Sequence, residues 1–202
     1  MDNLTNSIDQ VVQENALPHE WPKEVLSELK NIEVKNNNRS DLRKIPFVTI
    51  DGKDAKDFDD AVFCEANNDG FVLQVAIADV AEIVEANSSI DKEALLRGTS
   101  IYFPKKVIPM LPEEISNNLC SLIPNKDRNV LVCKINFSKE GEINTYEFSE
   151  AVINSHKRFT YNEVEFVKQN KDINLSADIL NSINALEKLT KQLLHNRSKR
   201  YA

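Results

Sequence analysis

The chain has 202 residues, of which 41% are apolar and 28% are charged, the ordinary balance of a globular protein with a core of its own. This composition excludes disorder, collagen and coiled coil for the whole chain, and no apolar run approaches the roughly 18–20 residues of a membrane helix. The net charge of −7 argues against coating nucleic acid by bulk electrostatics, although nucleic acid can still bind at one local site.

The first 45 residues are expected to form two short helices and a polar linker ahead of the main domain, residues 46–202. The periodicity predicts a helix over Ser7–Asn15, and a second helix runs from Pro22 to Asn31, since proline favours the first helical position. The Asn-rich segment 31–44 is expected to be a loop. The apolar face of the first helix is expected to carry Ile8, Val11 and Val12.

Strands dominate the middle of the chain, where short apolar runs are separated by turn residues. The sequence NNDG joins two of these runs, and SKEGE closes a long hairpin. A helix is expected over Ile90–Arg97. The expected strands are Pro46–Ile50, Ala61–Glu65, Phe71–Ala78, Val130–Phe137 and Ile143–Ile153, the fourth with Leu131, Cys133, Ile135 and Phe137 on one face.

The last quarter is expected to be helical, with one helix over Thr160–Gln169 and a second capped by Ser176. The second helix carries an apolar stripe, which is expected to pack against another apolar surface. From residue 156 onward, nine Lys/Arg against five Asp/Glu make this the basic end, which either complements the helix dipole or contacts phosphate. The order of elements predicts an α+β fold, a mixed sheet with flanking helices. The stripe comprises Ile179, Ile183, Leu186, Leu189 and Leu193.

The three cysteines lie in apolar settings without a C-x-x-C pair, and the histidines are far from them. They are therefore expected to be buried small hydrophobes in a reducing compartment, which favours the cytoplasm over an oxidising one. The N-terminus has no basic stretch followed by an apolar one, so no secretory signal is expected. Four isolated glycines also exclude a Walker loop and a dinucleotide fingerprint.

The stretch PFVTIDGKDAKDFDDAVF concentrates five carboxylates within ten residues. An EF-hand fails on register, because the glycine position would hold Val62 and the last ligand Asn68. Two interpretations remain, a solvated acidic turn and a site for a hard cation such as Mg²⁺ or Mn²⁺. Asp57 and Asp59 would point one way in an extended segment, while Asp60 would need a bend to join them.

The same stretch, TIDGKDAKDFDDAV, closely resembles the signature of the RNase II/RNase R family of exoribonucleases, in their RNB catalytic domain. The resemblance continues in order through the blocks VAIADVAEIV, DKEALLRGTSIYFP, IPMLPEEISNNLCSL and DRNVLVCKINFSKEGEI. Upstream, ALPHEWP and DLRKIP are similar to the lead-in of the ribonuclease R branch. An ordered series of blocks that covers about residues 8–200 is highly specific.

The resemblance implies processive Mg²⁺-dependent hydrolysis of single-stranded RNA from its 3′ end to nucleoside 5′-monophosphates. Mn²⁺ is the alternative cation that the hard-cation interpretation of the aspartates allows. The resemblance places metal ligands and catalytic residues at four aspartates, with Asp59 most tied to the chemical step. It also places Tyr102 and Tyr161 against the RNA 3′ end, where stacking suits a sequence-tolerant enzyme; ordinary packing is the alternative for each tyrosine. The four aspartates are Asp51, Asp57, Asp59 and Asp60, and Asp54 is left as a turn residue.

The chain also departs from the family pattern. The resemblance implies cold-shock and S1-type RNA-binding domains, and a second half of the catalytic domain with another stacking aromatic, an Arg and a Glu. None of these falls within residues 1–202, so a partial RNB-type domain is expected, its last helix lacking part of its partner surface. The alternatives are a non-catalytic remnant that binds metal or RNA only, a half that assembles with a second chain, and another two-metal phosphodiesterase. No membrane partner is expected.

Overall fold

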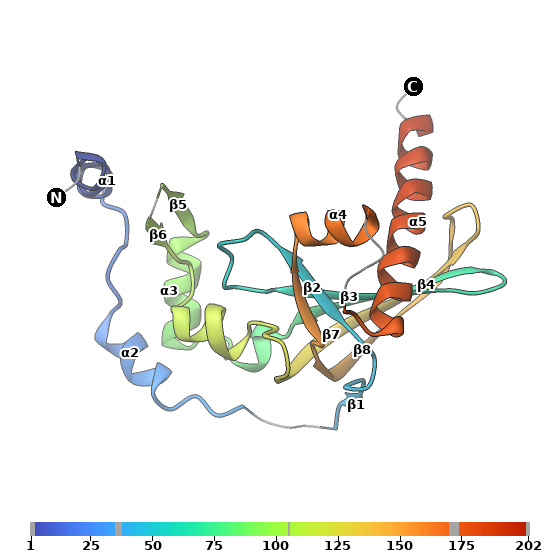
Figure 1. Cartoon of the computed structure of the whole chain (residues 1–202). Helices are drawn as coiled ribbons and strands as arrows, with labels where there is room; N and C mark the ends of the chain where they lie inside the picture. The colour runs from blue at the N-terminus through green and yellow to red at the C-terminus, as the bar shows by residue number, and fades with distance from the viewer. Residues whose placement is uncertain (1–2, 35–37, 105, 170–173, 201–202) are drawn as a thin grey trace. The chain divides into compact units, whose positions relative to one another are not determined.

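The computed structural model describes residues 3–34, 38–104, 106–169 and 174–200, and it confirms a mixed α+β fold (Figure 1). By packing, the chain divides into two compact units, one of residues 1–35 and 80–116, the other of residues 36–79 and 117–202. The proposed sequence boundary between residues 45 and 46 stays a prediction. Among the helices of the described ranges, none is long and apolar enough to cross a membrane.

The second unit is built on a seven-stranded sheet with the strand order β1-β8-β7-β4-β3-β2-β9. Its central strands are antiparallel, and the two outermost pairs, β1 with β8 and β2 with β9, are parallel. The expected strands are confirmed with shifted ends. The strands are β1 (Ser40–Asp41), β2 (Val48–Asp51), β3 (Asp60–Ala66), β4 (Gly70–Ala78), β7 (Asp127–Ser138), β8 (Ile143–Asn154) and β9 (Lys157–Thr160).

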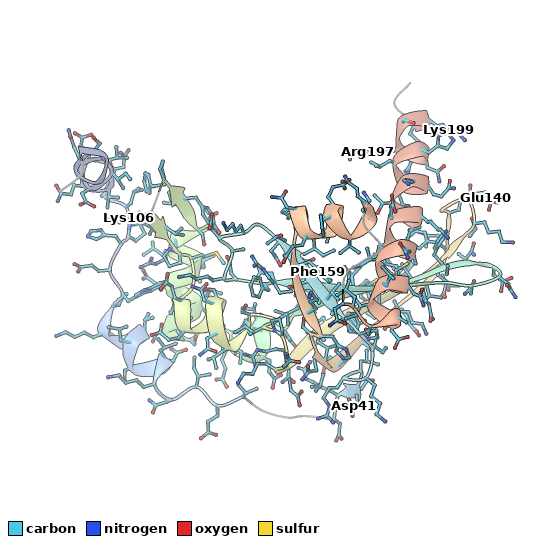
Figure 2. The ribbon with its side chains drawn as sticks, viewed as in Figure 1. Asp41, Lys106, Glu140, Phe159, Arg197 and Lys199 are labelled. Carbon is cyan, nitrogen blue, oxygen red and sulfur yellow. The ribbon has the colours of Figure 1, made fainter. Side chains whose placement is uncertain are left out.

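Two helices, α4 (Tyr161–Gln169) and α5 (Ala177–Arg200), pack on one face of this sheet (Figure 1). In the apolar stripe of α5, Ile179, Ile183 and Leu189 are buried against the sheet, and Leu186 and Leu193 are partly buried. The expectation that this helix lacks part of its partner surface is therefore wrong for the three buried residues. Phe159, labelled in Figure 2, belongs to the core between the sheet and both helices. The two clusters that join helices to sheet contain Val48, Phe159, Val167, Ile179 and Ile183, and Cys64, Phe137, Ala185 and Leu189.

The turn between β3 and β4 follows from its side chains. The Asn67 side-chain oxygen accepts hydrogen bonds from the backbone N–H groups of Asp69 and Gly70, both at 2.9 Å, which closes an Asx-type turn. Gly70 has a φ of +148°, and a Cβ there would lie 2.1 Å from the carbonyl oxygen of Phe137. The glycine is therefore required by the close approach of β7.

Two expectations about the strands are wrong. Segment 31–44 contains β1, which pairs with β8 although its two residues are polar and show no apolar alternation. The expected apolar face of β7 is covered by α5 only around Ile135 and Phe137, and Leu131 on that face is 47% exposed. On the opposite face Val130 and Val132 are buried, so β7 packs on both faces.

In its described residues, the first unit contains three α-helices, a short 3-10 turn and a two-stranded ribbon. The first helix is longer at its start than expected; its Ile8 and Val12 are buried against the ribbon residue Ile108, but Val11 is 41% exposed. Pro22 stands at the N-cap of the second helix rather than inside it. The elements are α1 (Asn3–Glu14), α2 (Lys23–Leu29), η1 (Val80–Glu82), α3 (Ser89–Arg97), β5 (Ile101–Phe103) and β6 (Lys106–Ile108).

Arg97 ties the first unit together. Its guanidinium lies 3.5 Å from the centre of the Trp21 ring and donates to the carbonyl oxygens of Glu20 and Pro109 and to the carboxylate of Glu93. The Arg97 side chain is nearly buried and has four partners. Its contacts with Glu20 and Trp21 hold the segment ahead of α2 in place. No periodicity in the sequence indicates these contacts.

The cysteines behave as expected from their apolar settings. Cys64 and Cys120 are buried and Cys133 is half-buried, and all three are free thiols. Burial raises the pKa of Cys64 to about 12 and that of Cys120 to about 11. Both thiols therefore stay protonated and unreactive at neutral pH.

Candidate metal and RNA site

The four predicted aspartates lie at the junction of β2 and β3 in the second unit. Asp51 is the last residue of β2 and Asp60 the first of β3, while Asp57 and Asp59 stand in the connecting segment. The two strands are antiparallel neighbours with Val48 opposite Val62. The acidic loop, residues 51–60, therefore begins and ends where these two neighbouring strands adjoin.

The start of β3 sets the position of Asp60. The pairing of β2 with β3 is set at Val48 and Val62, and on the other side of β2 Asp51 pairs with Thr160 of β9. The ladder between β3 and β4 runs in continuous register from Asp60 onward, so no bulge in it turns Asp60. Asp59 and Asp60 are exposed, whereas Asp51 and Asp57 are half-buried.

The electrostatics show four charges crowded together. Burial raises the pKa of Asp51 above its usual range, and the charge of Asp60 raises it further. Asp59 reaches solvent, yet partial desolvation is the largest cause that raises its pKa, followed by the charges of Asp57 and Asp60. Repulsion and desolvation both disfavour the ionised cluster, and a bound cation would relieve both.

The donor set fits a hard cation. One oxygen of Asp51, Oδ2, is buried and has no hydrogen-bond partner among the described residues, a costly state for a carboxylate. Carboxylate oxygens are the ligands that Mg²⁺ and Mn²⁺ prefer. Among the described residues, no three His, Cys, Asp or Glu side chains are already arranged around one point as metal ligands.

Tyr161 lies beside the acidic loop, at the start of α4, and is 65% exposed. A capping box fixes this helix end, because Thr160 donates from its N–H and its hydroxyl to Glu163 Oε2, both at 2.7 Å, and the Glu163 N–H donates back to the hydroxyl at 3.2 Å. These bonds hold the pKa of Glu163 below its usual range. A cavity of about 360 Å³ opens here, lined by Lys53, Arg158, Thr160, Tyr161, Asn162 and Glu163.

Tyr102 belongs to the other unit. It lies in β5 opposite Val107 of β6 and is 69% exposed, so its ring is available to a ligand. Its role at the RNA 3′ end stays a prediction.

The sequence interpretation missed Arg158 and Ser121, two side chains that contact the backbone of the acidic loop. Arg158 contacts Gly52 and Lys53 from β9, more than 100 residues away in sequence. Ser121 contacts Lys56 and Phe58 across more than 60 residues. Neither residue carries a local pattern that sequence analysis can recognise.

Comparison with known proteins identifies the family. Residues 39–202 match the model of the RNB domain. Ribonuclease R from Buchnera aphidicola is 48% identical over 192 residues, which cover 91% of this chain and 26% of that protein. The structure of Mycoplasma genitalium RNase R in complex with double-stranded RNA superposes with a TM-score of 0.93 at 37% identity, covering 98% of this chain and 36% of that chain.

The same RNase R in complex with ribose-methylated single-stranded RNA superposes with a TM-score of 0.92 at 36% identity, covering 98% of this chain and 32% of that chain. The chain thus spans about a quarter of the length of the curated relative and about a third of the related structures. Its fold and its sequence agree over nearly all of the part they share. This chain therefore belongs to the RNB domain family.

Proposed function

We propose that this chain is part of a 3′-to-5′ exoribonuclease that hydrolyses single-stranded RNA processively to nucleoside 5′-monophosphates. The observation that supports the proposal is the placement of Asp51, Asp57, Asp59 and Asp60 at, and between, the adjoining ends of β2 and β3 in an RNB domain. RNA binding is supported by the two related structures determined with RNA. Because the chain spans about a quarter of its relative, the activity of the whole enzyme is proposed and not inferred from the site alone.

The proposed cofactor is Mg²⁺, or Mn²⁺ in its place, held by the four aspartates. When bound, such a cation offsets the negative charge that grows on the phosphodiester in the transition state and activates water for attack. The four aspartates supply the negative charge that balances the cation, and their positions determine where the cation binds. Asp51 and Asp57, half-buried, are suited to hold the cation, whereas the exposed Asp59 and Asp60 can also reach the substrate.

The two tyrosines are proposed to bind the terminal nucleotides. Tyr102 and Tyr161 are 69% and 65% exposed, so both rings are free to stack on a base. Stacking of a base on an aromatic ring contributes about 1–3 kcal/mol and tolerates any base. This suits an enzyme that must bind each successive nucleotide of an RNA chain.

The metal part of the proposal is tested by calorimetric titration with Mn²⁺. The wild-type chain should bind Mn²⁺, and the double variant Asp59→Asn/Asp60→Asn should lose that binding. Asp54→Asn is the matched control, because Asp54 lies in the same loop and is exposed but is not among the four aspartates. Equal Mn²⁺ affinity in the double variant and the wild type would contradict the metal site.

The catalytic part is tested with end-labelled poly(A) and Mg²⁺. We expect negligible release of nucleoside monophosphates by residues 1–202, because losing a single preorganised charge donor typically costs about 10²–10³-fold in rate and the resemblance assigns such an Arg outside these residues. Adding the remaining part of an RNB domain as a second chain should restore hydrolysis. Metal binding without hydrolysis in both assays would favour the non-catalytic alternative, and hydrolysis by the lone chain that Asp59→Asn abolishes would show that it suffices.

A further inference from the structure

The acidic loop is anchored from outside rather than by its own contacts. Within it, the N–H of Ala55 donates to the carbonyl of Gly52 at 3.2 Å, which closes one turn. The loop carries five aspartates against two lysines, Lys53 and Lys56, so net repulsion favours an extended path unless other elements hold it.

One anchor lies at the far end of the loop. The hydroxyl of Ser121, which is fully buried, accepts from the N–H of Phe58 at 3.1 Å and donates to the carbonyl of Lys56 at 2.8 Å. The N–H of Leu122 donates to the carbonyl of Phe58 at 2.9 Å. The N–H of Ala78 donates to the carbonyl of Asp59, also at 2.9 Å. These bonds hold the backbone next to Asp57 and Asp59 in place. They do not reach residues 52–55, at the beginning of the loop.

The other anchor is Arg158. Its Nη2 donates to the carbonyl oxygens of Gly52 at 2.6 Å and of Lys53 at 2.9 Å. Its guanidinium carbon lies 5.4 Å from the centre of the Phe58 ring, within the range of a cation–π contact. A single side chain therefore joins the beginning of the loop to its far end.

We propose that Arg158 is a positioning residue that holds the acidic loop in the conformation in which its aspartates can share one cation. This inference rests on the proposed metal site. Both carbonyl contacts are made by Nη2, so this nitrogen of Arg158 is committed to the backbone of the acidic loop. A lysine would keep the charge but not the planar guanidinium, whose Nη2 donates to both carbonyls while its Cζ lies over the Phe58 ring.

The experiment compares Arg158→Met, Arg158→Lys and the control Lys157→Met by Mn²⁺ calorimetry and by hydrogen exchange of the backbone amides. Lys157 is the neighbouring cation on β9, and its Nζ lies over the Phe159 ring at 5.2 Å and not on the loop. We expect Arg158→Met to weaken Mn²⁺ binding about 10–100-fold, the usual effect of losing a residue that orients metal ligands. Amide exchange should accelerate in residues 52–58 and stay unchanged elsewhere, and Lys157→Met should match the wild type.

Arg158→Lys separates positioning from charge. It should accelerate exchange in residues 52–58 and weaken Mn²⁺ binding although the charge is kept, and it provides the same measurement should the Met variant fail to fold. Wild-type exchange and affinity in Arg158→Lys would overturn the role of the two carbonyl contacts. If the wild type binds no Mn²⁺, the proposed metal site fails. Even then, amide exchange that accelerates only in residues 52–58 of the Arg158 variants supports positioning of the loop by Arg158. Unchanged exchange in these variants overturns that role.

Discussion

The two ends of the seven-stranded sheet bury their aromatic side chains to very different extents. Phe159 on β9, beside the acidic loop, is 1% exposed in the core that joins the sheet to α4 and α5. Phe148 on β8, near the other edge, is 73% exposed and contacts the ring of Tyr146 at 5.8 Å between centroids. The acidic loop therefore lies at the end of the sheet whose aromatic side chain is buried in the core.

The difference has a topological origin. β9 is an edge strand covered by two helices, whereas β8 is paired along its outer side by β1 only at Ala151 and Val152. All residues of β8 from 143 to 150 are exposed. A functional loop needs a rigid support, and the helix-covered end of the sheet supplies it.

Replacing Phe159 should give the largest effect in this comparison. Phe159→Ala removes a fully buried ring and should lower the free energy of unfolding by about 3–5 kcal/mol. Phe148→Ala, the matched control at the other end, should change it by no more than about 0.5 kcal/mol. Urea denaturation of both variants checks the contrast, and equal losses would mean that the exposed edge is packed in solution.

The next effect concerns the contact between α5 and the sheet. The buried hydroxyl of Ser182 accepts a hydrogen bond from the N–H of Cys64 at 3.0 Å. Ser182→Ala leaves that buried donor unpaired and should lower the free energy of unfolding by about 1–3 kcal/mol. Exposed Ser198→Ala serves as the control in the same denaturation assay. A loss at Ser198 as large as that at Ser182 would argue against this explanation.

A smaller effect is expected at the capping box of α4. Thr160→Ala removes the hydroxyl that caps the helix beside the acidic loop and should cost about 1 kcal/mol. Thermal unfolding followed by circular dichroism measures this. The same substitution at exposed Thr145, which lies on β8, should have a smaller effect if the comparison between the two ends holds.

The capping box also predicts a dependence on pH. The pKa of Glu163 is lower in the folded state than in the unfolded chain, so its ionised carboxylate stabilises the fold above the ordinary carboxyl range. This contribution is lost as the pH falls through the folded-state pKa. Glu163→Gln should therefore be less stable than the wild type at pH 7, by a few tenths of a kcal/mol to about 1 kcal/mol, and the difference should vanish in acid. A difference that persists at low pH would contradict the assignment.

The smallest effect has the opposite sign. Without a cation, Asp59 is repelled by its acidic neighbours, so Asp59→Asn should raise the free energy of unfolding at neutral pH by at most about 0.5 kcal/mol. Added Mn²⁺ should stabilise the wild type but not the Asp59→Asn/Asp60→Asn variant, by the linkage of binding to folding. Thermal melts with and without Mn²⁺ test both statements, and a destabilised Asp59→Asn chain would refute the repulsion.

The elements that were predicted well have strong local signals. The stripe of α5, capped by Ser176, repeats at helical spacing and packs against the sheet. The turn at Asn67 and Gly70 has side chains that close it locally. By contrast, the two-residue strand β1 has no pattern of its own and exists only because β8 offers it a partner.

The sequence by itself determined the family, the helix and hairpin positions and the acidic residues, because each of these depends on neighbours close along the chain. Only the tertiary structure decided which faces are covered, as Val11 and Leu131 illustrate, since burial depends on what packs against a residue. It alone also revealed Arg158 and Ser121. Their contacts with the acidic loop join residues more than 60 positions apart, and hydrogen bonds to backbone carbonyls and N–H groups impose no pattern on the sequence at either end.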